Sequence, residues 1–130
     1  MIQFSAVTRR YPGGHEALRG VSLAIADGEM VAVTGHSGAG KSTLLKLAAG
    51  IERATHGSVV VNGQNLAALG ESGLAVLRRH IGFVFQDHKL LYDRSAFDNV
   101  ALPLRLAGFA RAETGKRARA ALDKVGLLAR

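Results

Sequence analysis

The sequence predicts an α/β fold in which an antiparallel β part and a strand, glycine loop and helix come first, and a helical part follows. Three observations predict it. Apolar and polar residues alternate in two runs within residues 1–25, as in half-buried strands. The stretch GHSGAGKST, residues 35–43, separates a short apolar run from a run rich in Leu and Ala. From residue 95 onward, apolar residues recur at the spacing of amphipathic helices.

Length and composition are those of an ordinary globular chain. The 130 residues suit one domain, and 48% hydrophobic with 21% charged residues excludes disordered and collagen-like classes. No apolar run approaches the ~20 residues of a membrane-spanning helix, and the first residues lack the pattern of a signal segment. The absence of cysteine excludes a disulfide framework and a thiolate metal site. We therefore expect a cytoplasmic protein.

The first elements follow from local patterns. Residues 1–7 and 21–25 alternate apolar with polar side chains and predict the two strands of a hairpin. Residues 30–34 are almost wholly apolar, as in a strand that is buried on both faces of a sheet. Residues 41–49 contain no Pro or Gly and predict a helix, which Gly50 ends.

The middle of the chain is again predicted to alternate strands and a helix. Residues 57–61 are rich in β-branched side chains and predict a strand closed by a turn at Asn62-Gly63. Residues 72–80 predict a helix. The run IGFVF, residues 81–85, predicts a further buried strand that ends at Gln86.

Two helices complete the prediction, over residues 95–107 and 112–128. Apolar residues of the second fall on one face: Ala118, Ala121, Leu122, Val125 and Leu128. The division expected is a β subdomain with the loop core over residues 1–86 and the start of a helical subdomain over residues 87–130.

The net charge of +7 is concentrated near the C-terminus, where residues 105–130 hold seven Lys or Arg against Glu113 and Asp123. Such a surplus is typical of the solvated face of a helix, and less often of a surface that binds nucleic acid. No nucleic-acid recognition motif accompanies it, so we expect no nucleic-acid partner. Binding that fell steeply with salt would favour the alternative.

The glycine-rich stretch carries the chemistry. Gly35-x-x-x-x-Gly40-Lys41-Ser42 matches the phosphate-binding P-loop pattern in full. Its glycines leave the backbone free to wrap a phosphate chain with successive N–H groups. Lys41 supplies an ammonium for the β- and γ-phosphates, and Ser42 opens the helix, where its hydroxyl can ligate Mg²⁺. A glycine turn with an incidental lysine is the alternative, which the flanking strand and helix disfavour.

Two other residues each have two interpretations. Tyr11 either stacks on an adenine or packs in a loop. Gln86 either reaches a Mg²⁺ ion or its water, or is a capping or surface group after a strand. The five histidines have no i, i+4 pair and no accompanying carboxylate cluster, so we expect them to form no metal site.

Together these residues resemble the first half of an ATP-binding-cassette ATPase, a P-loop NTPase, and the resemblance covers the whole chain. In that family an aromatic residue stacks the adenine, and a glutamine loop leads into a helical subdomain that faces a membrane partner. The resemblance implies that Tyr11 stacks the base, that Thr43 assists at the α-phosphate, and that Ser42 and Gln86 serve Mg²⁺. The residues it implies for binding Mg-ATP are Tyr11, Gly35, His36, Ser37, Gly38, Ala39, Gly40, Lys41, Ser42, Thr43 and Gln86.

Within this family the stretches GHSGAGKSTLLKL, GIERATHGSV, FVFQDHKLL and RSAFDNVALPL look most like the ATP-binding subunits of bacterial cell division. His36 and Asp87-His88 carry that choice. The resemblance implies an integral membrane partner of FtsX type, a homodimer in the full-length family, and a place on the inner face of the cell membrane through the partner. The ATPase subunits of lipoprotein-release and macrolide-export systems share the layout through residues 99–104 and are the alternative.

The sequence departs from the family pattern in one respect. Family members continue to a signature motif of LSGGQ type, an apolar strand that ends in Asp-Glu, and a switch histidine, and none of these occurs in the 130 residues. No carboxylate stands where it would hold Mg²⁺ or activate water, so we assign no catalytic residue. We expect the N-terminal half of such an ATPase, which binds nucleotide weakly and does not hydrolyse it. A non-catalytic nucleotide-binding fragment that docks on a membrane partner is the alternative.

Overall fold

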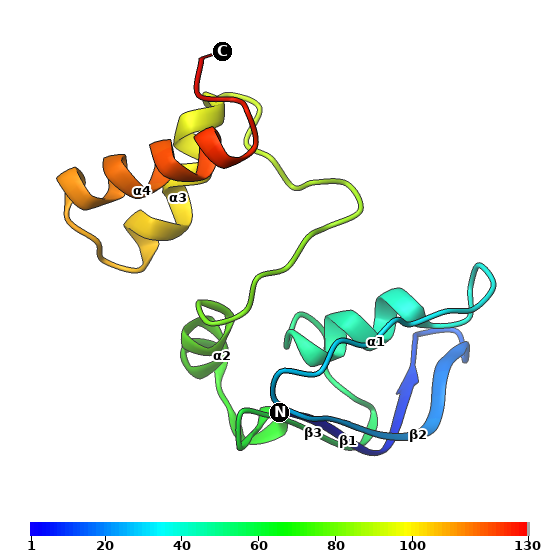
Figure 1. The fold of residues 1–130 in the computed structure, drawn as a ribbon. Coiled ribbons are helices and arrows are strands. Elements are labelled where there is room, and N and C mark those ends of the chain that lie inside the picture. The colour runs from blue at the N-terminus through cyan, green and yellow to red at the C-terminus, as the bar shows by residue number, and fades with distance from the viewer. Residues whose placement is uncertain (130) are drawn as a thin grey trace. The chain divides into compact units, whose positions relative to one another are not determined.

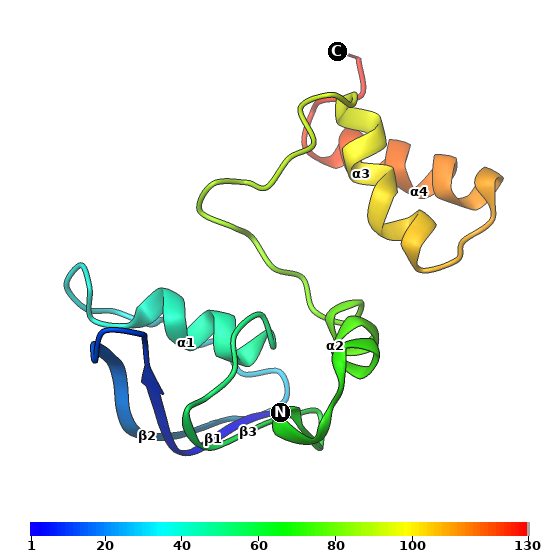
Figure 2. The same ribbon diagram turned by 180° about the vertical axis from the view of Figure 1, so that it is seen from behind.

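The computed structural model describes residues 1–129, which form two compact units. The first spans Met1–Gly82 and the second begins at Phe83. Figure 1 shows the strands and the first two helices in the first unit, and Figure 2 shows the same elements from behind. None of the helices within residues 1–129 combines the length and the apolar character needed to cross a membrane.

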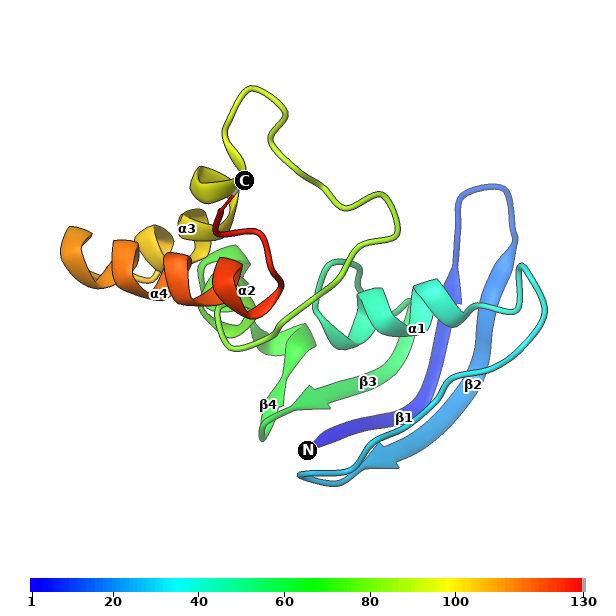
Figure 3. The ribbon, with the colours of Figure 1, turned by 45° about the horizontal axis from the view of Figure 1, so that its top comes forward.

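An antiparallel sheet forms one layer of the first unit. Its strands are β1 (Ile2–Arg10), β2 (Glu16–Ile25), β3 (His56–Val61) and β4 (Gln64–Asn65), in the order β2-β1-β3-β4. Figure 3 shows β1 between β2 and β3. Ile2 pairs with Ile25 on one side and with Val61 on the other. The predicted hairpin and the predicted strand after it are therefore confirmed.

The predicted turn at Asn62-Gly63 joins β3 to β4. Both residues have positive φ, 48° at Asn62 and 77° at Gly63, as a type I′ hairpin turn requires. Val60 then pairs with Asn65 and Val61 with Gln64.

Helix α1 (Lys41–Ala48) packs on the sheet and confirms the helix predicted after the glycine loop. It ends as predicted, because Gly50 takes φ 65° and donates its N–H to Leu47 O at 3.1 Å, while Ile51 N–H bonds to Lys46 O at 2.9 Å. These two bonds satisfy carbonyls that the end of a helix leaves free. Leu47, 1% exposed, anchors the helix to the sheet.

The core of the first unit lies between the sheet, α1, the short 3₁₀ helix η1 (Leu66–Ala68) and α2 (Glu71–Arg78). Helix α2 corresponds to the helix predicted over residues 72–80. The buried core side chains are Phe4, Val7, Leu18, Leu47, Val59, Val61, Leu66, Leu74 and Leu77.

Two predicted strands are wrong. Residues 30–34 and 81–85 have irregular backbone and pair with no strand among the described residues. Met30 is 97% exposed and Val84 is 91% exposed. A strand needs a neighbour for its N–H and C=O groups, and an apolar run by itself does not specify that neighbour.

The second unit contains α3 (Ala96–Leu106) and α4 (Arg111–Lys124), which pack against each other and confirm the two predicted helices (Figure 2). Ala101 and Ala118 are fully buried, and Leu122 is buried beside them. The apolar face predicted for the last helix is too long. Helix α4 ends at Lys124, Gly126 takes φ 71°, and Val125 is 67% exposed.

The start of α3 is held by polar contacts. Ser95 Oγ accepts a hydrogen bond from Asp98 N–H at 3.1 Å and so caps the helix. Arg105 donates to the Asp98 carboxylate at 2.8 Å, and this bond, with that from the Ser95 hydroxyl, lowers the pKa of Asp98. The carboxylate therefore stays ionised near neutral pH at the positive end of α3.

Asn99 ties the loop before α3 to the helix. Its amide nitrogen donates to Ser95 O at 2.9 Å and to Leu91 O at 3.0 Å, and its Oδ1 accepts from Leu91 N–H at 2.8 Å. We expect Asn99→Asp to lower the free energy of local opening of residues 88–96 by about 1–2 kcal/mol, because a carboxylate oxygen would replace the donor. Hydrogen exchange of that segment measures the change.

Asn65→Asp is the matched control. Within residues 1–129 the Asn65 side chain bonds only through its oxygen, which accepts from Ala67 N–H at 3.0 Å, so an aspartate keeps that bond. Equal effects of the two substitutions would contradict the role given to the amide nitrogen of Asn99.

Candidate functional site

The glycine loop, residues 35–40, joins the irregular segment before it to α1. Gly38 has φ 81°, and a Cβ built on it would meet nothing within 4 Å, so this face of the loop is open. Gly40 has φ 97°, and a Cβ there would lie 2.9 Å from Leu18 Cδ2 and closer still to Ala17 O. The two glycines therefore serve different ends: Gly38 leaves space, and Gly40 lets the loop pack against β2.

The loop ends at the positive end of α1. Gly40 is the N-cap residue, no side chain caps the helix, and no acidic residue stands in its first turn. Among residues 1–129, the N–H groups of Gly38, Gly40, Lys41 and Ser42 have no intramolecular hydrogen bond. Free N–H groups at an uncapped helix N-terminus favour an anion.

Lys41 keeps its ammonium inside the loop. Nζ donates to Gly35 O at 2.6 Å and to His36 O at 2.7 Å. The His36 ring lies with Nδ1 2.8 Å from Ser37 O, and because a carbonyl only accepts, Nδ1 carries the proton in this contact. The Lys41 ammonium is thus held at the same loop whose free N–H groups favour an anion.

These residues fit a nucleotide phosphate chain and its metal ion. The loop offers backbone donors, an open glycine face and the Lys41 ammonium. The Ser42 hydroxyl makes no hydrogen bond in the part of the chain that the structure describes, and a hydroxyl at this position suits a hard cation such as Mg²⁺. The loop residues predicted from the sequence are therefore brought together at one place.

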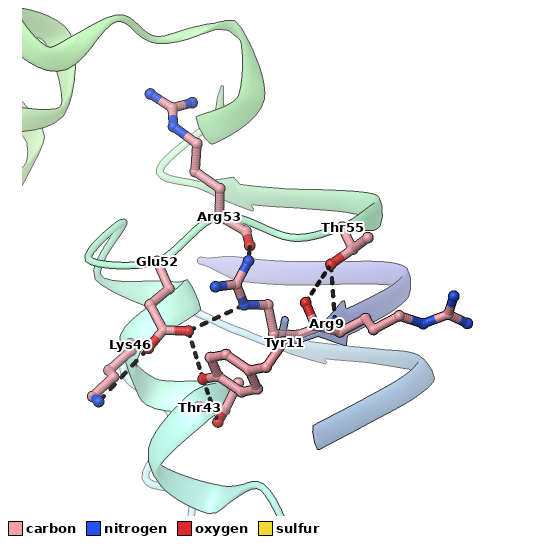
Figure 4. Close-up of polar contacts among 8 residues, drawn as sticks. Arg9, Tyr11, Thr43, Lys46, Glu52, Arg53 and Thr55 are labelled. Carbon is pink, nitrogen blue, oxygen red and sulfur yellow. Dashed lines mark hydrogen bonds and ion pairs between the residues drawn. The ribbon is translucent and has the colours of Figure 1, made fainter. Parts of the chain in front are cut away.

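Tyr11 lies beside the same helix (Figure 4). Its hydroxyl donates to Glu52 Oε2 at 2.6 Å and is 3.2 Å from Thr43 Oγ1. The Arg9 guanidinium carbon stands 4.6 Å from the centre of the Tyr11 ring. The structure thus brings Tyr11 to Thr43, the last residue of the predicted site stretch.

Glu52 was missed by the sequence reasoning. Its carboxylate contacts Arg9 Nε at 3.2 Å and Lys46 Nζ at 3.6 Å, and its side chain is 19% exposed (Figure 4). The Arg9 contact is an ion pair without hydrogen-bond geometry, because Nε has no hydrogen-bond partner among the described residues. Glu52 lies 41 positions from Tyr11, and the stretch GIERATHGSV that contains it gave no sign of this contact.

Another carboxylate, that of Glu16, is paired with two arginines near the turn between β1 and β2. The Arg10 side chain donates to the Glu16 carboxylate, and Arg19 contacts the same carboxylate at 3.0 Å. The hydrogen bond from Arg10 is the main cause that lowers the pKa of Glu16. Glu16 therefore stays ionised and adds no proton chemistry near neutral pH.

Gln86 belongs to the second unit, whereas the glycine loop belongs to the first. It is exposed, in a turn where His88 N–H bonds to Phe85 O at 3.2 Å. The neighbouring Asp87 pairs with Lys89 at 2.7 Å, and that contact lowers the pKa of Asp87. The metal-binding role of Gln86 stays a prediction.

Comparison with known proteins agrees with this geometry. The family model described as ABC transporter matches residues 18–130. The dimeric structure of a post-hydrolysis state of the ATP-binding cassette MJ0796, bound to ADP and Pi, superposes with a TM-score of 0.89 at 35% identity. That match covers 95% of this chain and 56% of the other. The fold is that of an ABC ATPase nucleotide-binding domain over about half of its length.

Two relatives with similar sequence identity to this chain are named for different functions. The cell division ATP-binding protein FtsE of Escherichia coli K12 is 52% identical over 98% of this chain, which spans 58% of that protein. The methionine import ATP-binding protein MetN of Caulobacter vibrioides is 48% identical over 99% of this chain, which spans 39% of that protein. The chain thus spans little more than half of the length of the first relative and less of the second.

Proposed function

The chain belongs to the ABC transporter family, and from this premise we propose that it is the ATP-binding part of a subunit that acts in bacterial cell division with an integral membrane partner of FtsX type. The observation that supports ATP binding is the open glycine loop at the uncapped end of α1, with the Lys41 ammonium inside it. The observation that supports the cell-division role is the 52% identity to FtsE.

Each loop residue has a part in the proposed site. The free N–H groups of Gly38, Gly40, Lys41 and Ser42 bind phosphate oxygens. The Lys41 ammonium neutralises the β- and γ-phosphates, and the Ser42 hydroxyl ligates Mg²⁺. Tyr11 stacks the base, and Gln86 serves the metal. His36 and Ser37 lie in the turn that shapes the loop.

We propose a cytoplasmic location, peripheral on the inner face of the membrane through the partner, and a homodimer as the working form. The dimer is supported by the structural similarity to the cassette MJ0796, whose solved structure is dimeric.

A methionine-import role is the second candidate, because MetN of Caulobacter vibrioides is nearly as similar as FtsE. Co-purification separates the two. The chain would be co-expressed once with the membrane partner of a cell-division subunit and once with that of a methionine importer. If the chain retained only the importer's membrane subunit during purification, the cell-division role would be overturned.

Calorimetric titration with Mg-ATP tests the nucleotide site. We expect the chain to bind Mg-ATP and Lys41→Ala to raise its Kd by about 10–100-fold, because a hydrogen-bonded charge contributes about 1.5–3 kcal/mol. Lys116→Ala removes the same charge from α4 and is the control, with an expected change below about twofold. Equal Kd values for Lys41→Ala and the unaltered chain would contradict the site.

A further inference from the structure

The Tyr11 phenol is fixed by two segments that the sequence does not place together. Its hydroxyl bonds to Glu52, which follows α1, and lies 3.2 Å from Thr43 within α1 (Figure 4). Helix α1 begins with Lys41 and Ser42. The hydroxyl of Tyr11 is thus attached to the helix that carries the proposed phosphate and metal contacts.

The Glu52 carboxylate is itself held from two sides. Arg9 on β1 and Lys46 on α1 both form ion pairs with it, and its side chain is mostly buried. Arg9 is fixed in turn, because its Nη1 donates to Arg53 O at 3.0 Å. A charge compensated in this way is a strong acceptor for a phenol and keeps one geometry.

Arg9 also covers part of the Tyr11 ring. Its guanidinium lies over one ring face, 4.6 Å from the ring centre, which is a cation–π contact. Arg9 therefore keeps a base off that face of the ring, and the nearly parallel His15 ring lies 6.4 Å away, centre to centre. Arg9 and Glu52 together determine the plane of the ring and its distance from α1.

We propose that Glu52 is a positioning residue for the base: it fixes the Tyr11 ring relative to α1, so that a nucleotide contacts the ring and the glycine loop at the same time. The inference rests on the proposed function, since it takes Tyr11 as the stacking residue. Its consequence is selectivity. Glu52 adds to the affinity for a nucleotide and adds nothing to the affinity for a triphosphate without a base.

The experiment compares Mg-ATP with Mg-tripolyphosphate, which has phosphates and no base, by calorimetry on the full chain. We expect Glu52→Ala to raise the Kd of Mg-ATP about tenfold and to change that of Mg-tripolyphosphate less than twofold, as for loss of one hydrogen bond to a charged group. Glu52→Gln, which keeps size and one acceptor, should restore part of the affinity for Mg-ATP. Asp123→Ala removes one negative charge from α4 and controls for net charge.

Tyr11→Phe keeps the ring and removes the hydroxyl. It should reproduce the effect of Glu52→Ala, and the double variant should be no weaker than either single variant, because both remove the same bond. Additive losses, or an equal loss for both ligands, would overturn the proposal, since either result means that Glu52 acts on folding or on the phosphates.

Tyrosine emission measures the contact without any ligand. A phenol that donates to a carboxylate fluoresces weakly, and in a Tyr92→Phe background Tyr11 is the sole tyrosine. Glu52→Gln should raise the emission, and an unchanged emission would overturn the proposal.

The binding experiment also separates this proposal from the proposed function. If the unaltered chain binds neither Mg-ATP nor Mg-tripolyphosphate, the proposed function is overturned. If the unaltered chain binds both ligands with equal Kd, phosphate binding stands and only the base-stacking role of the Tyr11 ring is overturned.

Discussion

We expect Gly40→Ala to abolish measurable binding of Mg-ATP, with Kd raised more than about 100-fold, and to lower the free energy of unfolding of the chain by about 3 kcal/mol. Two costs combine. Gly40 has φ 97°, a backbone conformation that costs an L-residue about 1–2 kcal/mol. In addition, the new Cβ would overlap Ala17 O and lie 2.9 Å from Leu18 Cδ2.

Relief of this overlap moves the loop away from β2. Ala17 O is a backbone atom and Leu18 is a buried core residue, so neither yields easily. The loop is displaced instead, together with the first N–H groups of α1. The binding site is thereby lost at its phosphate end. Calorimetry measures the binding, and urea unfolding followed by far-ultraviolet circular dichroism measures the stability.

Gly38→Ala is the matched control for stability. Gly38 also has left-handed backbone, φ 81°, but a Cβ on it meets nothing within 4 Å. We expect a loss of only about 1 kcal/mol from backbone strain. If Gly38→Ala destabilised the chain as much as Gly40→Ala, the close contact with β2 would not be the cause.

The second large effect is expected at Gly57, where Gly57→Ala should lower the free energy of unfolding by about 3 kcal/mol or more. Gly57 is the second residue of β3 and has φ 81°, and a Cβ on it would lie 2.5 Å from Ser5 O and closer still to Ala6 O. The pairing of β1 with β3 is irregular between Ser5 and Thr8, and Ala6 itself has φ 48°. The two backbones approach so closely at this bulge that only glycine fits.

Gly63→Ala separates close approach from backbone conformation. Gly63 has a nearly equal φ of 77° in the turn before β4, but open space around its Cβ position. Its substitution should cost about 1 kcal/mol. Urea unfolding of both variants measures the difference, and equal losses would show that β1 can move away from Gly57.

The sequence reasoning succeeded where a few neighbouring residues carry the signal. The alternation in residues 1–7 predicted β1, Asn62-Gly63 predicted the turn before β4, and Gly50 predicted the end of α1. It failed for residues 30–34 and 81–85, whose apolar character implies burial but specifies no neighbouring strand. It also placed the end of the last helix too late, because Gly126 in left-handed conformation ends α4 before the apolar pattern stops.

The sequence by itself determined the glycine loop, the helix that begins with Lys41 and the family to which they point. The loop and the helix depend on backbone conformations and side chains within residues 35–49, and the family follows from that stretch together with Tyr11 and Gln86. Only the tertiary structure decided that Gly40 packs against Ala17 and that Glu52 holds Tyr11, because such contacts join residues far apart in the chain. A local pattern specifies the conformation of its own residues, whereas the partner of a carboxylate or of a close backbone approach depends on how the whole sheet and α1 pack.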